Sequence, residues 1–206
     1  MTGGVPLVAI RHAPTAWNEA RRLQGRTDVA LGEAGAAAAR AWRLDPAWRG
    51  YRVLSSPLQR ALATAKLLFP AGQIEIDARL MEMDFGAWEG KTLAELRDQP
   101  GSDAKSRESL GLDFHPPKGE SPREVQSRLA PLLQEIARRG EPTIAVTHKA
   151  VLRALLSLAT GWQMLGKPPV KLLPASAHCF RLGERGSISI ERMNVPLVAD
   201  VDAGAR

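Results

Sequence analysis

The chain has 206 residues, of which 44% are hydrophobic, which is enough for one sizeable core. Its only cysteine, Cys179, excludes an internal disulfide and a multi-cysteine metal site, and is typical of a reducing compartment. The net charge of +6 permits nucleic-acid binding, but there is no run of five basic residues and no basic–aromatic alternation. A small anionic substrate explains the positive charge equally well, so we expect no nucleic-acid partner.

The apolar segments are short. Val5–Ile10 is too short for the core of a signal peptide, and the later stretch "AVLRALLSLATGW" is interrupted by Arg153 and too short to span a bilayer. We therefore expect a cytoplasmic protein without a membrane partner. Residues 1–206 are expected to form a single domain, and a homodimer is one open alternative for its assembly.

Five regions have the pattern of β-strands, with a C-terminal pair counted as one region. The first and fourth are apolar on both faces, which is typical of central strands covered by helices on each side. The predicted strands are Val5–Ile10, Arg52–Ser55, Ile74–Asp77, Thr143–Thr147, and the pair His178–Leu182 and Ser187–Met193.

Helical patterns lie between these strands, at residues 33–44, 57–69, 121–140 and 149–161. Ser121 is the expected N-cap of the third helix, with Pro122 at its first position and Glu124 closing a capping box. Ser56 is expected to cap the second helix in the same way. The alternation of strands and helices predicts an α/β fold: a three-layer α/β/α sandwich around a mostly parallel central sheet.

Residues 98–120 differ from the rest because they are polar, rich in Gly, Pro and Ser, and weakly periodic. They are either a disordered linker or a surface excursion that caps a site. We expect residues 86–120 to form a substrate cap, with helical and loop segments. The residues after Val195 are expected to form a loosely held tail.

Charged and imidazole side chains follow three of the predicted strands. Arg11 and His12 follow the first strand, Arg60 follows the second, and His148 follows the fourth. In an open α/β sheet, ligands bind outside the carboxyl ends of the strands, where helix N-termini also point. Two forked guanidiniums and two imidazoles at one edge suit the oxygens of a phosphoryl group.

Six motifs in order resemble the histidine phosphatase superfamily, in its phosphoglycerate mutase-like branch: "IRHAPTAWN", "LQGRTDVALGEAG", "VLSSPLQRALATA", "MEMDFGAWEG", "PKGES" and "VTHKAVLRALL". The resemblance extends from about Val5 to Gly161. It implies a metal-independent, cofactor-free phosphomonoesterase that hydrolyses a small phosphorylated metabolite through a phosphohistidine. The sequence is similar to α-ribazole phosphatase-like and broad-specificity members. A mutase and a non-catalytic phosphate-ester-binding module are the alternatives, and the short chain favours a phosphatase.

The resemblance also implies roles for five residues. His12 would be the nucleophile, Arg11 and Arg60 would clamp the phosphoryl oxygens, and His148 would stabilise the transition state. Glu82 would be the general acid. A backbone carbonyl that accepts one ring N–H of His12 would fix its tautomer and orient the ring.

Further positions either match the lining of the phosphate pocket or are alternatives to Glu82 as the general acid. Asn18, Gln24 and Gly25 match positions that line the pocket. Asp84 and Glu89 are the alternatives to Glu82 as the working carboxylate.

The remaining candidates are expected to be structural. Asp28 is expected to be a turn residue, and His115 a surface residue with a lesser chance of substrate contact. His178 and Cys179, which has no activating base, are expected to be structural. Trp17 and Trp88 belong either to the core or to the pocket.

The chain departs from the family pattern at Ala13, where glycine is usual after the nucleophile. We expect an allowed backbone conformation there, with an effect on substrate fit and not on the chemistry. Lys118 is a candidate cation near the entrance of the site.

Overall fold

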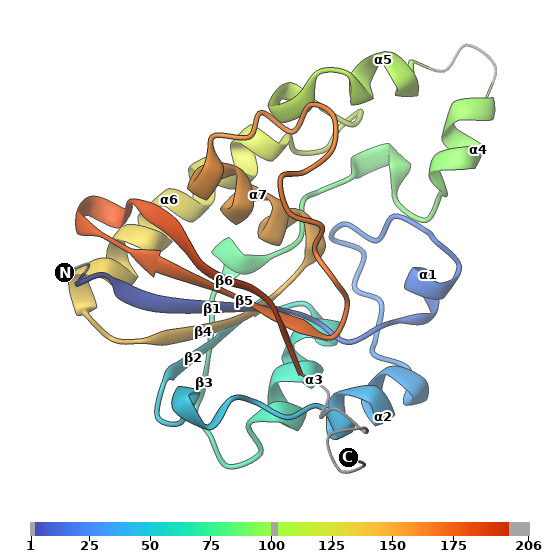
Figure 1. The fold of residues 1–206 in the computed structure, drawn as a ribbon. Coiled ribbons are helices and arrows are strands. Elements are labelled where there is room, and N and C mark those ends of the chain that lie inside the picture. The colour runs from blue at the N-terminus through green and yellow to red at the C-terminus, as the bar shows by residue number, and fades with distance from the viewer. Residues whose placement is uncertain (1–2, 100–102, 198–206) are drawn as a thin grey trace, which may run out of the picture.

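The computed structural model describes residues 3–99 and 103–197. Six strands form one sheet in the order β3-β2-β4-β1-β5-β6 (Figure 1). The first four strands of the chain pair in parallel, while β5 and β6 pair antiparallel at one side. Their bounds are β1 Val5–Arg11, β2 Arg52–Ser55, β3 Ile74–Ile76, β4 Thr143–Thr147, β5 Ser176–Leu182 and β6 Ile188–Pro196. The predicted mostly parallel sheet is confirmed.

Helices cover both faces of this sheet, with α6 and α7 on one face and α2 and α3 on the other (Figure 1). The α/β/α sandwich is therefore confirmed. The helices are α1 Ala16–Glu19, α2 Glu33–Ala41, α3 Gln59–Leu68, α4 Leu93–Asp98, α5 Ala104–Glu108, α6 Pro122–Arg139 and α7 Lys149–Thr160. None of the helices in the described residues has the length and apolar character needed to cross a membrane.

The alternation of side chains along β1 divides the core into two halves. Leu7 and Ala9 pack in the cluster that contains apolar residues of α6 and α7. Val8 and Ile10 pack in the cluster that contains Trp42 on the opposite face. Because both faces of β1 are buried, the strand is apolar throughout, as the sequence predicted for a central strand.

The start of α6 confirms one predicted cap, and the start of α3 contradicts the other. The Ser121 hydroxyl accepts from the Glu124 amide, and the Glu124 carboxylate accepts from the Ser121 amide at 2.7 Å. In contrast, α3 has Leu58 as its N-cap and no side-chain cap. The predicted cap at Ser56 was wrong because α3 begins only at Gln59, while the Ser56 hydroxyl binds the Leu58 amide and the His148 ring, as described below.

Part of the segment 86–120, which we call the cap segment after its expected role, packs against the loop that follows α7. The Leu112 amide donates to the Gln163 carbonyl at 3.0 Å. The neighbouring Gly111 has φ +59°, and a Cβ there would lie 2.3 Å from the same carbonyl oxygen. Glycine at 111 therefore permits both the backbone turn and the close approach of the two segments.

The chain end beyond Val195 is more ordered than the sequence predicted. Leu197 is fully buried, its amide donates to the Ala175 carbonyl at 2.9 Å, and its carbonyl accepts from the Arg43 amide. The expectation of a loosely held tail was therefore wrong for residues 196–197. The rest of that segment, residues 198–206, lies outside the described residues.

Candidate active site

The carboxyl ends of β1, β2 and β4 meet at one edge of the sheet. In the register of the sheet, Arg11 pairs with Thr147 and Ser55 pairs with Val146. The His12 amide donates to the Thr147 carbonyl at 2.9 Å, so the chain leaves β1 beside the start of α7. This register brings the His12 and His148 rings to a centroid separation of 5.1 Å.

The His12 ring has one fixed tautomer. Its Nδ1 lies 2.7 Å from the Ala13 carbonyl oxygen, which can only accept a hydrogen bond, so Nδ1 carries the proton. Burial and, after it, the positive charge of Arg11 lower the pKa of His12 to about 3. The imidazole is therefore neutral at physiological pH, with the lone pair on Nε2.

Ala13 fits this arrangement without backbone strain. It is absent from the described non-glycine residues that have positive φ. Its amide donates to the Thr64 hydroxyl at 3.0 Å, and its side chain packs with Val8 and Ile10 in the core. Ala13 is buried in the core and does not line the pocket, so its position gives no support to the expected effect on substrate fit.

His148 is fully buried at the N-cap of α7. Its Nε2 lies 2.8 Å from the Ser56 hydroxyl, which also accepts from the Leu58 amide at 3.3 Å. The Ser56 hydroxyl can donate its proton to Nε2, and in that arrangement neutral His148 carries its ring proton on Nδ1, which has no other hydrogen-bond partner. Burial holds the pKa of His148 well below its usual value, and the neighbouring His12 and Arg60 act in the same direction.

Arg60 is fully buried and holds the loop that precedes α2. Its Nη2 donates to the Gly25 carbonyl at 2.7 Å and its Nη1 to the Thr27 carbonyl at 3.0 Å. Gly25 has φ +53°, and a Cβ there would lie 1.8 Å from a carboxylate oxygen of Glu89. Gly25 thus positions Arg60 through its backbone and is not part of the pocket lining.

Several buried polar atoms at this edge have no hydrogen-bond partner. Among the described side chains, such atoms are Nε of Arg11, Oε1 of Gln24, Nη1 of Arg52, Nε of Arg60 and Nδ1 of His148. All of these except the Arg52 atom belong to the group of residues around His12. Unsatisfied buried polar groups are rare in folded proteins, so the concentration of unpartnered nitrogen atoms on Arg11, Arg60 and His148 indicates a site for an anion.

Glu82 lies at the same site and is only 7% exposed. Its Oε1 accepts from the Met83 amide at 3.0 Å and from the Ala150 amide, near the start of α7, at 3.1 Å. Burial raises the pKa of Glu82, although these amides and the charges of Arg60 and Arg11 oppose the shift.

The two competing carboxylates have structural partners. Asp84 accepts from the Gly86 amide at 2.7 Å, and Glu89 accepts from the Arg26 amide at 2.8 Å and from the Thr27 amide. Neither lines the pocket.

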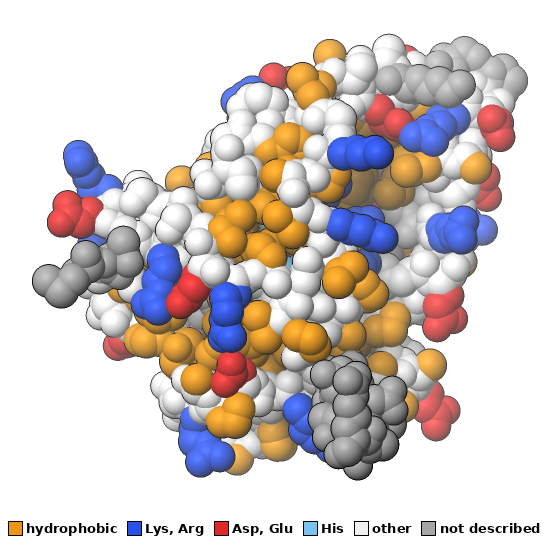
Figure 2. Space-filling model, in the orientation of Figure 1, with side chains coloured by type: hydrophobic (Ala, Val, Ile, Leu, Met, Phe, Trp, Pro, Cys, Tyr) orange, Lys and Arg blue, Asp and Glu red, His pale blue; other side chains and the backbone are white. Residues whose placement is uncertain are grey.

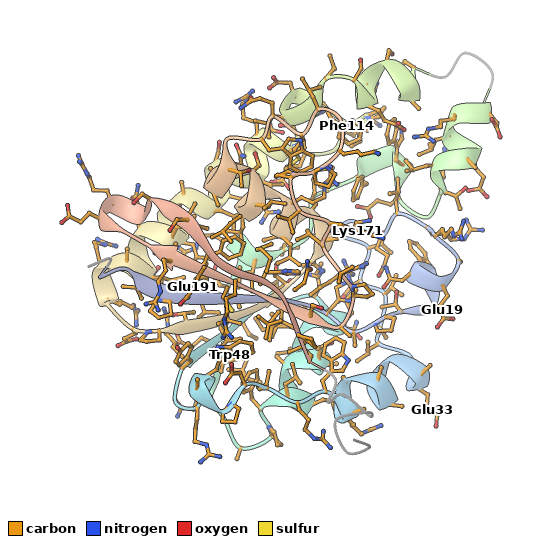
Figure 3. All side chains as sticks on the ribbon, in the orientation of Figure 1. Glu19, Glu33, Trp48, Phe114, Lys171 and Glu191 are labelled. Carbon is orange, nitrogen blue, oxygen red and sulfur yellow. The ribbon has the colours of Figure 1, made fainter. Side chains whose placement is uncertain are left out.

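A pocket of about 660 Å³ opens from this edge of the sheet. Figure 2 shows the hollow between the main body and the region of α4, with Lys and Arg side chains on its rim and hydrophobic side chains inside. The cap segment contributes Leu93 and Phe114, the latter labelled in Figure 3. The predicted site residues that line the pocket are Arg11, His12, Asn18, Gln24, Arg60 and Glu82.

Asn18 presents one end of its amide to the pocket. Its Oδ1 accepts from the Thr15 amide at 3.0 Å and from the Thr15 hydroxyl at 3.2 Å. The Nδ2 group is therefore the part of Asn18 that can donate to a ligand.

The sequence analysis missed several cations of the pocket lining, and we call the part of the pocket that they line the outer pocket. Lys149 and Arg153 on α7 line it, together with Arg21. Arg153 interrupts an otherwise apolar stretch of the sequence, and that interruption was the signal that pointed to it.

The lesser candidates lie away from the pocket lining. Asp28 accepts from the Gln59 amide at 2.7 Å and so supports the first turn of α3. His115 forms an ion-pair contact of 3.2 Å with Glu124. Lys118 is exposed with φ +60°. The possible contributions of His115 and Lys118 at the site are thus not supported by their positions.

The buried candidates have structural surroundings. His178 is 1% exposed, its Nδ1 accepts from the Asn194 amide at 3.3 Å, and burial lowers its pKa to about 4. Burial raises the pKa of Cys179 to about 11, so the thiol is inert. Trp88 packs in a small core cluster with Leu96, and Trp17 likewise does not line the pocket.

These features define an α/β protein with a buried, cation-rich anion site at the carboxyl ends of parallel strands. The model of the histidine phosphatase superfamily (branch 1) matches residues 7–196. The chain therefore belongs to the histidine phosphatase superfamily, and it is a phosphatase of that superfamily.

Curated relatives and solved structures agree with this assignment. Phosphoglycerate mutase-like protein 4 of Arabidopsis thaliana is 32% identical over 194 residues, 89% of this chain and 83% of the relative. The metal-independent phosphoserine phosphatase of the same plant is 34% identical over 188 residues, 87% and 77% of the two chains. A mycobacterial glucosyl-3-phosphoglycerate phosphatase complexed with VO3 has a TM-score of 0.73 and 28% identity, and the match covers 93% and 99% of the chains. Some mycobacterial relatives are longer, and the chain covers 43% of their length.

Proposed function

We propose that this protein is a metal-independent phosphomonoesterase that hydrolyses a small phosphorylated metabolite through a phosphohistidine on His12. The observation that carries the proposal is the set of unpartnered nitrogen atoms on Arg11, Arg60 and His148 around a neutral imidazole. A phosphoryl group supplies the acceptor oxygens that these donors lack, and it presents phosphorus to the free Nε2.

In the first step, Nε2 of His12 attacks phosphorus and the bond from phosphorus to the ester oxygen breaks. Negative charge on the equatorial oxygens is met by Arg11, Arg60 and Nδ1 of His148, which are already oriented. The leaving oxygen takes a proton from Glu82, which burial keeps protonated to higher pH than an ordinary glutamate.

In the second step, Glu82 is a carboxylate and accepts a proton from water, and the water oxygen attacks the phosphohistidine. The bond between phosphorus and Nε2 breaks, inorganic phosphate leaves, and both side chains return to their starting protonation states. The cationic side chains take the role that a metal ion has in other phosphatases, so the two steps need no metal.

The cap segment would restrict this pocket to small esters. Leu93 and Phe114 line the pocket, and the Leu112 amide fixes the segment to the loop after α7. This covering favours a small metabolite over the side chain of a folded protein partner.

Hydrolysis of para-nitrophenyl phosphate tests the proposal. The wild-type chain should release phosphate at the same rate with and without EDTA, and His12→Ala should lose at least about 1,000-fold in kcat/KM, as expected when the nucleophile is removed. Undiminished turnover by His12→Ala, or loss of activity in EDTA, contradicts the mechanism. Transfer between phosphoglycerates with little release of phosphate would indicate a mutase, and binding without turnover would indicate a sensor.

A further inference from the structure

The pocket continues beyond the phosphate site, along α7, and two cations line that continuation. Lys149 is the first residue of α7 and Arg153 lies about one turn further along the helix. Ala150 lies between them, and its amide binds Glu82, the proposed donor to the leaving oxygen. If the ester oxygen of a substrate lies beside Glu82, as the proposed function requires, Arg153 faces the carbon skeleton and not the phosphoryl group.

An aromatic ring holds the Arg153 guanidinium in place. Its Cζ lies 4.7 Å from the centroid of the Trp162 ring. The Trp162 Nε1 donates to the Leu165 carbonyl at 2.9 Å, which fixes the ring that supports the guanidinium. Such a contact stabilises the cation in a partly buried position while its N–H groups stay available to a ligand.

This part of the pocket lacks counter-ions. Among the residues that the structure describes, no carboxylate forms an ion pair with Lys149 or Arg153, whereas Arg52, Arg79 and Arg128 elsewhere each have such partners. The acidic residue at the outer pocket, Glu108, already binds Arg97 at 2.5 Å. Arg153 is thus a partly buried cation whose charge no described acidic side chain balances.

The cations also form a continuous row. After the larger effect of burial, the charges of Arg11 and Arg153 both lower the pKa of Lys149, and Glu82 opposes them with a smaller effect. Lys149 is therefore close enough to interact electrostatically with both Arg11, at the phosphate site, and Arg153. An anionic group beside Lys149 and Arg153 would relieve this repulsion.

We propose that the substrate carries a second anionic group, a carboxylate or a further phosphate, which Arg153 and Lys149 bind. Its uncharged skeleton would lie against the apolar lining that includes Phe85 and Phe114. Arg153 is then a specificity-determining residue, because the forked guanidinium pairs with two oxygens of one anion. This inference rests on the proposed phosphomonoesterase function.

Matched pairs of esters test the inference through the ratio of their kcat/KM values. The first pair, 3-phosphoglycerate and glycerol 3-phosphate, differs by a carboxylate in place of a hydroxymethyl group. The second pair, fructose 1,6-bisphosphate and fructose 6-phosphate, differs by a second phosphate. We expect the wild-type chain to prefer the more anionic member of at least one pair by about 10- to 100-fold, as for a hydrogen bond between charged groups. The pair that shows the preference identifies the anion.

Variants of Arg153 separate charge from packing. Arg153→Met keeps an apolar stem and should reduce the preference to less than about threefold, whereas Arg153→Lys should recover part of it. The control is Arg138→Met, which removes one positive charge from an exposed position on α6 and should keep the wild-type ratio. Thermal unfolding of each variant checks that it is folded.

The possible failures are distinguishable. If para-nitrophenyl phosphate and the neutral esters are hydrolysed but neither pair shows a preference, the inference is wrong and the proposed function stands. A preference that survives in Arg153→Met also overturns it. If no ester is hydrolysed, the proposed function is wrong and the inference fails with it.

Discussion

His12 and His148 lie side by side, but their ring nitrogens have different partners. The Ala13 carbonyl fixes the proton of His12 on Nδ1 and leaves Nε2 as a base, whereas the Ser56 hydroxyl binds Nε2 of His148. One ring can therefore attack an electrophile while its neighbour donates a hydrogen bond. Two identical side chains acquire different chemistry because each has a different local acceptor or donor.

Ser56 is a positioning residue for His148, and its replacement should slow the reaction. In Ser56→Ala the ring loses the partner at Nε2, so neither its orientation nor the location of its proton is fixed. We expect kcat to fall about 10-fold with a smaller change in KM, which corresponds to the loss of one buried hydrogen bond.

Steady-state kinetics of Ser56→Ala and of the conservative Ser56→Thr check this role. The threonine variant retains the hydroxyl group and should recover most of the rate. Equal kcat values in wild type and Ser56→Ala would show that the contact does not matter to the reaction.

The pH dependence of kcat/KM should reflect Glu82 more than His12. The pKa of His12 is lowered to about 3, so the ring stays neutral and the rate should show no acidic loss around pH 6.5 from protonation of this histidine. The pKa of Glu82 is raised, so its loss of the proton, and the accompanying fall in rate, should occur above the ordinary glutamate range.

Profiles of wild type and Glu82→Gln, measured with one substrate, separate enzyme from substrate ionisation. The glutamine variant should lose about 10²- to 10⁴-fold in rate and should lack the alkaline fall assigned to Glu82. An unchanged profile in Glu82→Gln would assign the proton transfer to another group.

At the scale of elements, the contact between the cap segment and the loop after α7 shapes the outer pocket. Gly111 approaches the Gln163 carbonyl, and that loop also carries Trp162, which supports Arg153. Gly111→Ala should displace the cap segment, because the new Cβ would lie 2.3 Å from that oxygen. We expect a higher KM and a loss of unfolding free energy of about 2–3 kcal/mol.

Gly140 provides the matched control for this substitution. It also has a left-handed backbone, with φ +67°, but a Cβ there would meet no atom within 4 Å. Gly140→Ala should therefore cost only about 1 kcal/mol for the conformation and leave KM unchanged. Chemical denaturation and KM measurements on both variants check the difference. Equal effects at the two sites would show that the contact between Gly111 and the Gln163 carbonyl does not shape the pocket.

At the scale of the whole molecule, the sequence predicted those features that depend on local pattern or on strand order. The doubly apolar β1 and β4 are central, and the residues that follow parallel strands converge at one edge because parallel strands end together. The tertiary partners were beyond its reach. Ser56 had the pattern of a helix cap, and nothing near it in the chain indicates His148, which lies 92 positions away.

The outer pocket had only a weak signal in the sequence, the interruption of an apolar stretch by Arg153, and nothing in the sequence indicates what that side chain faces. Arg153 is an ordinary helix residue by spacing, and only the packing of the loop after α7 places Trp162 beneath its guanidinium. Gly25 matched a pocket position, yet it acts through its carbonyl on Arg60. The motifs thus identified the reacting groups. The residues that position those groups, and the residues expected to contact the rest of the substrate, could be identified only from the tertiary structure.

The central claim is that Nε2 of His12 takes the phosphoryl group before water does. Rapid mixing with a ³²P-labelled phosphomonoester that the enzyme turns over, followed by quenching and peptide mapping, tests this most directly. We predict a burst of label on the His12 peptide that is stable in alkali, labile in acid and absent in His12→Ala. Product formation without transient label on His12, or label that persists in His12→Ala, would contradict the account.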